Sequence, residues 1–282
     1  MAGSFFISSI RSLAQHYDAM LCDAWGVIHN GVDLFPGVTD ALRTFRKERG
    51  PVVILTNAPR PRRVIPPQLD RLGLPRDAYD GVVTSGDATR AAIRAHLPSP
   101  AFRLGPSKDE ALFDGLDIQF AELEASGFMI CTGLEDDQQE SPDDYRSLLQ
   151  RAAALKLPMV CANPDIVVNW GGRMIWCAGA LAEIYEGLGG KVIYGGKPHA
   201  PIYDVACEMI DNIRPGISKS RILAVGDGLK TDIQGANNQG IDALYIAGAG
   251  GVHDGVADEA GVKAKLRAAG ARVVAASEAL LW

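Results

Sequence analysis

The chain has 282 residues, of which 47% are hydrophobic and 22% are charged, and its formal net charge is −6. These values are typical of a water-soluble folded protein and argue against a general nucleic-acid-binding surface, which would be basic. No apolar run approaches the roughly 20 residues that cross a bilayer. We therefore expect no nucleic-acid partner and no membrane partner. The five cysteines lack CxxC spacing, so we expect buried thiols in the reducing cytoplasm.

Short apolar runs alternate with helical patterns in both terminal parts of the chain, which is typical of βαβ units around a parallel sheet. We expect strands at 19–23, 52–55, 82–85, 222–225 and 243–246. We expect helices from about residue 37, through 69–72, at 202–210 and at 233–239. This order predicts a doubly wound parallel sheet.

The middle of the chain carries a second set of alternating signals. Strands are expected at 102–104, 128–131, 158–161 and 174–176, and helices at 145–155 and 178–188. The stretch from Asn169 to Gly172 is typical of a hairpin turn, so we leave Trp170 and Arg173 out of the candidate site. The strand at 192–194 is expected to return the chain to the first sheet. The predicted fold is therefore α/β: a Rossmann-like core of residues 1–84 and 190–282, with an α/β cap domain of residues 85–189 inserted.

Polar residues follow several of the predicted core strands. Asp23, Thr56 and Asp227 each stand at or just after the end of an apolar run, and Lys197 comes three residues after another. Because ligands bind beyond the carboxyl ends of parallel strands, we expect these four side chains to share one edge of the sheet.

This set matches the needs of phosphoryl transfer, which requires a nucleophile, alignment and charge neutralisation. Asp23 is the candidate nucleophile and would form an aspartyl-phosphate. Asp23 and Asp227 would hold Mg²⁺ together with a backbone carbonyl or waters, and Lys197 would supply a second positive charge. Thr56 and the backbone amide of Asn57 would hold phosphate oxygens. For Asp232, two roles stay open: orienting the site from behind the metal ligands, or capping the next helix.

The ordered motifs resemble those of the haloacid dehalogenase superfamily, in particular its NagD-like branch with a large inserted cap. They are Asp23-x-x-Gly26-Val27, Thr56-Asn57, Lys197-Pro198 and Gly226-Asp227-x-x-x-Thr231-Asp232, joined by Asn163-Pro164-Asp165 in the middle segment. The resemblance implies a hydrolase in which Asp23 is the nucleophile, Thr56 binds phosphate and Lys197 steadies both. It also implies Mg²⁺ held by Asp23, Asp227 and the backbone carbonyl of Trp25.

Trp25 departs from the family pattern. Family phosphatases usually carry there an Asp that protonates the leaving oxygen, a service worth about 10²–10⁴-fold in rate. His29 and His199 are candidate substitutes, and Asn163 or Asp165 is a candidate cap-to-site contact. We expect a magnesium-dependent phosphatase acting on a small phosphorylated metabolite. The alternatives are a phosphate-binding or regulatory protein with weakened catalysis, and transfer to an acceptor other than water. The oligomeric state stays open, a homo-oligomer included.

Overall fold

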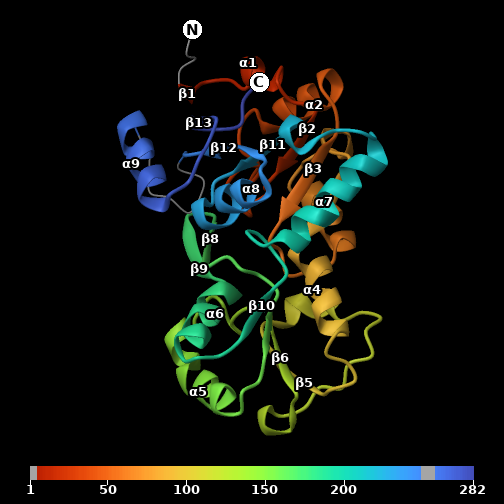
Figure 1. Ribbon diagram of the computed structural model, residues 1–282, viewed down its shortest axis with the longest axis vertical. Coiled ribbons are helices and arrows are strands. Elements are labelled where there is room, and N and C mark those ends of the chain that lie inside the picture. The colour runs from red at the N-terminus through yellow and green to blue at the C-terminus, as the bar shows by residue number, and fades with distance from the viewer. Residues whose placement is uncertain (1–4, 249–257) are drawn as a thin grey trace.

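The computed structural model describes residues 5–248 and 258–282, and in this part of the chain it shows two main sheets (Figure 1). The larger sheet is parallel throughout and has the order β1-β13-β12-β11-β2-β3-β4. Its strands are β1 (Phe6–Ile7), β2 (Ala19–Cys22), β3 (Val52–Thr56), β4 (Gly81–Thr84), β11 (Ile222–Gly226), β12 (Asp242–Ile246) and β13 (Ala275–Ser277). The predicted α/β fold is confirmed.

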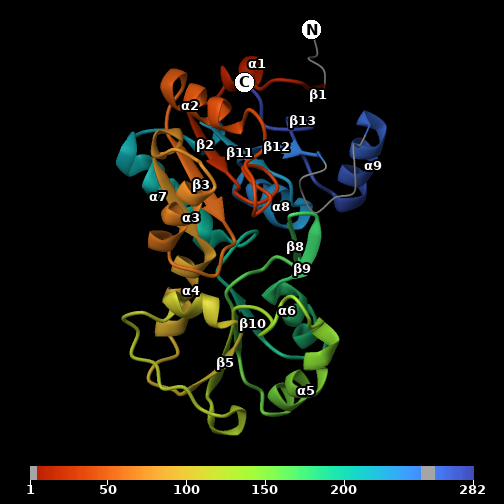
Figure 2. The same cartoon turned by 180° about the vertical axis from the view of Figure 1, so that it is seen from behind.

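Helices cover both faces of the larger sheet. One face packs against α1 (Arg11–Ala14), α2 (Val38–Glu48) and α3 (Ile65–Arg71), which lie in front in Figure 2. The other face packs against α7 (Ala200–Ile213), α8 (Gln234–Gln239) and α9 (Glu259–Ala269). Strands with apolar residues on both sides, such as β3 with five buried residues, are what such a three-layer arrangement requires.

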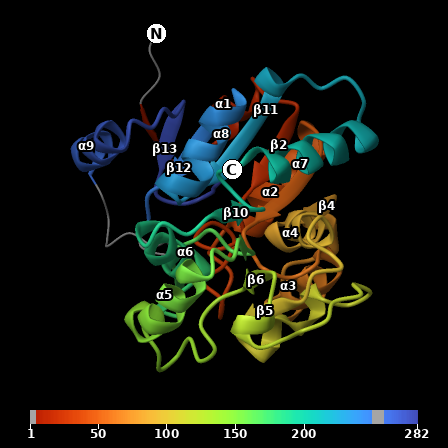
Figure 3. The same cartoon turned by 60° about the horizontal axis from the view of Figure 1, so that its bottom comes forward.

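The smaller sheet lies beyond the carboxyl ends of the larger one and has the order β10-β7-β6-β5. Its strands are β5 (Ala101–Leu104), β6 (Phe128–Cys131), β7 (Met159–Cys161) and β10 (Val192–Tyr194). Figure 3 shows α5 (Arg146–Ala154) and α6 (Ala178–Gly187) on one side of this sheet and α4 (Ser85–Arg94) on the other.

The strand at 192–194 corrects one sequence-based expectation. β10 pairs in parallel with β7, with Tyr194 opposite Cys161, so it belongs to the smaller sheet and not to the first one. We therefore propose that the chain returns to the core after Tyr194 and not at residue 190.

A separate antiparallel hairpin extends from the smaller sheet toward the larger one. β8 (Val167–Trp170) and β9 (Arg173–Trp176) pair around the predicted turn, and Gly171 N donates to Asn30 O at 3.0 Å. The tip of the hairpin therefore contacts a loop that follows β2.

Candidate active site

Three neighbouring strands of the larger sheet end at polar residues. β11, β2 and β3 are adjacent and parallel. Asp227 follows β11, Asp23 follows β2, and Thr56 is the last residue of β3. All three side chains are buried. The structure thus brings them to one edge of the sheet, and their chemical roles stay predictions.

Lys197 joins this edge from the loop that follows β10. Its Nζ lies 2.6 Å from Asp23 Oδ1 and 2.6 Å from Asp232 Oδ1, and it donates to Leu55 O at 3.0 Å. Burial lowers the pKa of Lys197, but Asp23 and Asp232 outweigh burial and leave that pKa well above its ordinary value. Lys197 is therefore a buried cation shared by two carboxylates.

Asp232 lies in a π-helical turn (Leu229–Ile233) that follows β11. Its Oδ2 accepts from Gly228 N at 3.0 Å while Oδ1 faces Lys197. Because α8 begins only at Gln234, Asp232 is not the cap of that helix. Its position agrees with a role in orienting the site.

A divalent cation fits this site by charge and by donor type. Carboxylate oxygens of Asp23, Asp227 and Asp232 lie within 4.8 Å of one another, and Mg²⁺ prefers such hard oxygen donors. Three carboxylates face one lysine, so the ionised cluster is anionic. Burial, and next the charge of Asp232, raise the pKa of Asp23 well above its ordinary value, whereas Lys197 lowers it. A bound cation would favour the ionised form of Asp23 that a nucleophile needs.

Trp25, the second residue after Asp23, has no group that could donate a proton to a leaving oxygen. It is half-buried, and its ring meets the ring of His29 edge to face, with centroids 4.9 Å apart. The contribution of its carbonyl oxygen to metal binding stays a prediction.

Both candidate histidines have a lowered pKa and contacts of their own. His29 is 1% exposed, its Nδ1 accepts from Gly31 N at 3.0 Å, and burial lowers its pKa to about 4. His199 stacks on Tyr194 with ring centroids 4.7 Å apart, and burial lowers its pKa as well. Both rings are therefore neutral near pH 7.

Asn57 connects the phosphate loop with two other segments through its side chain. Its Oδ1 accepts from Lys197 N at 2.8 Å, and its Nδ2 donates to Lys197 O at 3.2 Å and to Asp165 Oδ1 at 2.9 Å. Asp165 precedes the hairpin, so this bond confirms a cap-to-site contact. The predicted role of Asn57 concerns its backbone amide, and its side-chain role was missed because no spacing rule joins residues 57 and 165.

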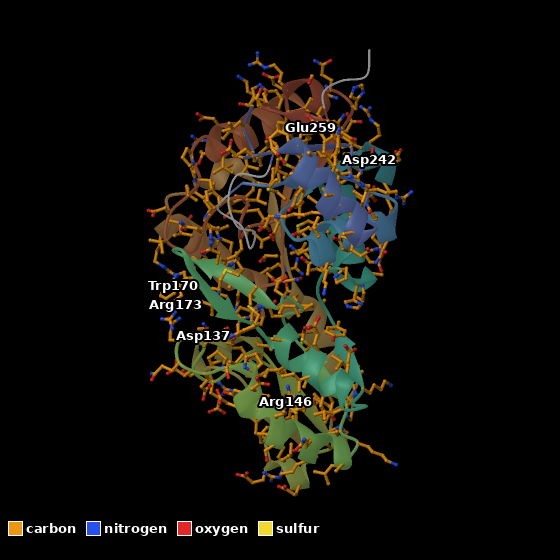
Figure 4. All side chains as sticks on the ribbon, turned by 90° about the vertical axis from the view of Figure 1, so that its left-hand side faces the viewer. Asp137, Arg146, Trp170, Arg173, Asp242 and Glu259 are labelled. Carbon is orange, nitrogen blue, oxygen red and sulfur yellow. The ribbon has the colours of Figure 1, made fainter. Side chains whose placement is uncertain are left out.

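Two pockets adjoin this network. One, of about 310 Å³, is lined by Asp23, Asp227 and Asp232. The other, of about 250 Å³, lies between the two sheets and includes Trp170 and Trp176. Trp25, Asp165 and Val168 line both pockets. Figure 4 shows Trp170 at the level where the two sheets meet. Trp170 was excluded because its neighbourhood is typical of a hairpin turn, a pattern that does not show which pocket a side chain lines.

Comparisons with known proteins agree with this architecture. The family described as haloacid dehalogenase-like hydrolase matches residues 20–119, and the one described as HAD-hydrolase-like matches residues 194–275. The crystal structure of a haloacid dehalogenase-like family hydrolase from Brucella suis 1330 is 44% identical, with a TM-score of 0.88, and covers 98% of this chain and 100% of its own.

Two curated proteins are more distant. Phosphoglycolate phosphatase 2 of Arabidopsis thaliana is 24% identical over 269 residues and covers 85% of each chain. Sugar-phosphatase AraL of Bacillus subtilis is 26% identical over 236 residues, covering 81% of this chain and 83% of its own. Together with the fold and the ordered motifs, these findings show that the chain belongs to the haloacid dehalogenase-like hydrolases, in their NagD-like branch.

Proposed function

We propose that this hydrolase is a magnesium-dependent phosphatase that acts on a small phosphorylated metabolite through an aspartyl-phosphate on Asp23. The observation that carries the proposal is the position of Lys197, bound to both Asp23 and Asp232 beside Asp227. The names of two relatives, a phosphoglycolate phosphatase and a sugar-phosphatase, support the reaction class.

Each residue of the site has a role in this reaction. The Asp23 carboxylate attacks phosphorus, and Lys197 holds that carboxylate in place. The Thr56 hydroxyl and the Asn57 amide bind phosphate oxygens, while Asp232 keeps Lys197 charged and oriented. Mg²⁺, held by Asp23, Asp227 and the Trp25 carbonyl, would neutralise charge on the transferred group. Water then hydrolyses the aspartyl-phosphate.

The pockets limit the substrate. A leaving group that extends from Asp23 enters the space of about 250 Å³ between the sheets, which suits a small metabolite. In the described residues no helix is long and apolar enough to span a membrane. All five cysteines lie in the described part and are free, which fits the reducing cytoplasm that we propose as its location.

A second candidate is a phosphate-binding or regulatory protein, and Trp25 is the observation that favours it. Incubation of the protein with a panel of phosphate esters, in Mg²⁺ or in EDTA, separates the two functions. A phosphatase releases phosphate only with Mg²⁺, and a denaturing quench traps phosphate on the protein.

The variant Asp23→Asn should lose turnover and trapped phosphate while it keeps its fold. Asp33→Asn, an exposed carboxylate on a nearby loop, is the matched control and should keep both. Binding of Mg²⁺ and inorganic phosphate without turnover of any ester would favour the binding protein, and wild-type turnover by Asp23→Asn would exclude the covalent mechanism.

A further inference from the structure

The proposed phosphatase lacks a proton donor at the position where its family usually carries one. When Asp23 attacks, the departing oxygen of an alkyl ester needs a proton, because an alkoxide is a poor leaving group. Trp25 has no acidic group, and His29 and His199 are neutral near pH 7. Another residue that lines the same cavity could supply this proton.

Asp165 is the carboxyl group in the required position. It lines the pocket that contains Asp23 and also the pocket that lies between the two sheets. A substrate that places its phosphate at Asp23 and its leaving group in the second pocket must pass the boundary that Asp165 shares. Asp165 does not belong to the cluster of three carboxylates within 4.8 Å. That separation suits in-line displacement, in which the leaving oxygen lies opposite the nucleophile.

Three hydrogen bonds fix the Asp165 segment. Asp165 N donates to Asn163 Oδ1 at 3.0 Å, and Gly179 N at the start of α6 donates to Asp165 O at 3.1 Å. Its Oδ1 accepts from Asn57 Nδ2 at 2.9 Å. An acceptor bond to Oδ1 leaves Oδ2 as the atom that can carry and deliver a proton. The group is thus oriented from both the cap and the core.

The surroundings of Asp165 also shift its pKa toward neutral pH, so its protonated form is more populated there than that of an ordinary carboxyl group. Its pKa is raised to about 6: burial is the largest cause and the charge of Asp232 adds to it, whereas the charge of Lys197 and the bond from Asn57 lower the pKa. The pocket that contains Asp23 is also lined by the charged groups of Asp227 and Lys230. The second pocket, between the two sheets, is lined by the charged groups of Arg60, Lys108, Asp109 and Asp137. In the second pocket Lys108 pairs with Asp137 and Arg60 lies 3.7 Å from Asp109, so these charges largely offset one another.

We propose that Asp165 is the general acid and base of this enzyme, acting from the cap in place of a carboxylate at position 25; the inference rests on the proposed phosphatase function. In the first step an Asp23 oxygen bonds to phosphorus and the bond from phosphorus to the ester oxygen breaks. The released electron pair takes the proton from Asp165 Oδ2, which gives the alcohol and the Asp165 carboxylate.

In the second step a water oxygen attacks phosphorus and passes its proton to Asp165. The bond from phosphorus to Asp23 breaks, which releases phosphate and restores the starting forms of Asp23 and Asp165. The proton and the electron pairs balance over the cycle.

The test compares an alkyl phosphate with an aryl phosphate in the variant Asp165→Asn. The phenolate of an aryl ester leaves without help, so kcat/KM for the alkyl ester should fall about 10²–10⁴-fold and that for the aryl ester much less. The descending alkaline limb of the kcat/KM profile for the alkyl ester should disappear. The control Asp143→Asn removes an exposed carboxylate of the cap that pairs with Arg146 at the surface. It should change neither the ratio of kcat/KM for the alkyl and aryl esters nor the pH profile of kcat/KM.

A second variant separates chemistry from a structural role. Trp25→Asp in the Asp165→Asn background should restore activity mainly on the alkyl ester, which a cap merely loosened by the Asp165 change would not allow. An unchanged alkyl-to-aryl ratio in Asp165→Asn, together with a retained alkaline limb, would overturn this inference and leave the phosphatase function standing. If the wild type hydrolyses neither ester, the phosphatase function itself fails.

Discussion

Gly26 lies so close to Asp227 that a Cβ atom on Gly26 would fall 2.1 Å from Asp227 Oδ2. Gly26 also has φ +75°, a conformation that L side chains rarely adopt. The loop after Asp23 and the loop after β11 can therefore approach only because position 26 has no side chain. This contact sets the distance between the two carboxylates that are expected to share a cation.

Gly26→Ala should displace Asp227 and weaken Mg²⁺ binding at least about tenfold, as loss of a residue that orients metal ligands typically does. Isothermal titration with Mg²⁺ measures this. The matched control is Gly73→Ala, which has φ +89° but whose added Cβ would meet no atom of the described residues within 4 Å. Equal losses of Mg²⁺ affinity in the two variants would mean that backbone strain, and not contact with Asp227, sets the affinity.

Lys197→Met should lower the free energy of unfolding at pH 7 by about 3–5 kcal/mol, because it leaves Asp23 and Asp232 buried without their cation. The loss should shrink at acid pH, where Asp23, whose pKa lies well above its ordinary value, can take up a proton. Urea unfolding at both pH values measures the effect. Lys47→Met, at an exposed position of α2, should change the free energy by less than about 0.5 kcal/mol. Equal stability of the two variants would show that the buried ion pairs contribute little to folding.

The residues that the sequence located well are those that follow apolar strands. Asp23, Thr56 and Asp227 are found because parallel strands that alternate with helices place their carboxyl ends at one edge. Lys197 is found in the same way, although its strand belongs to the other sheet. A three-residue apolar run such as 192–194 carries no information about the sheet that it joins, which is why its assignment was wrong.

Contacts between the cap and the core could not be derived in this way. The bond between Asn57 and Asp165 joins residues 108 positions apart, and it depends on how the cap is placed over the core. Short edge strands were missed as well, since two residues of β1 show no periodicity. The π-helical turn that contains Asp232 (Leu229–Ile233) likewise follows from packing and not from a sequence pattern.

His29 should make the stability depend on pH. Burial lowers its pKa from 6.5 to about 4, so the folded protein binds fewer protons than the unfolded chain between these values. The contribution of the neutral ring to the free energy of unfolding is fully present above pH 6.5. About 3 kcal/mol of this free energy is lost as the pH falls to about 4. Urea unfolding from pH 7 to pH 4 measures this loss.

The matched variant for this test is His29→Asn, which keeps an acceptor near Gly31 N but cannot take up a proton in this range. Other groups titrate in both proteins, so their contributions cancel in the difference between wild type and variant. Between pH 7 and pH 4, the free energy of unfolding of the variant should rise by about 3 kcal/mol relative to that of the wild type. A difference that stays constant with pH would show that His29 is not the group responsible.

Gly31 lies where the hairpin of the cap touches the core. A Cβ atom on Gly31, which has φ +90°, would fall 2.3 Å from Trp170 Cδ1 and 2.5 Å from Trp25 Cη2. Gly31→Ala should therefore push the hairpin away from the core and open the pocket between the sheets. Because the Asp23 and Lys197 pair lies outside this contact, we expect KM for a phosphate ester to rise about tenfold and kcat to change less, since the loss concerns binding and not the reacting groups.

The control for this prediction lies in the same hairpin. Gly172 also has φ +90°, but a Cβ atom there would meet no atom of the described residues within 4 Å. Gly172→Ala should thus carry the backbone strain without the contact and leave KM near the wild-type value. Trp170→Ala added to Gly31→Ala removes one of the two rings that the new methyl would strike, the other being that of Trp25, so the double variant should bind substrate better than additive effects predict. Two results would show that the close packing of Trp170 on Gly31 does not hold the pocket closed. One is that the effects of Gly31→Ala and Trp170→Ala on KM simply add in the double variant, and the other is that Gly172→Ala raises KM as much as Gly31→Ala does.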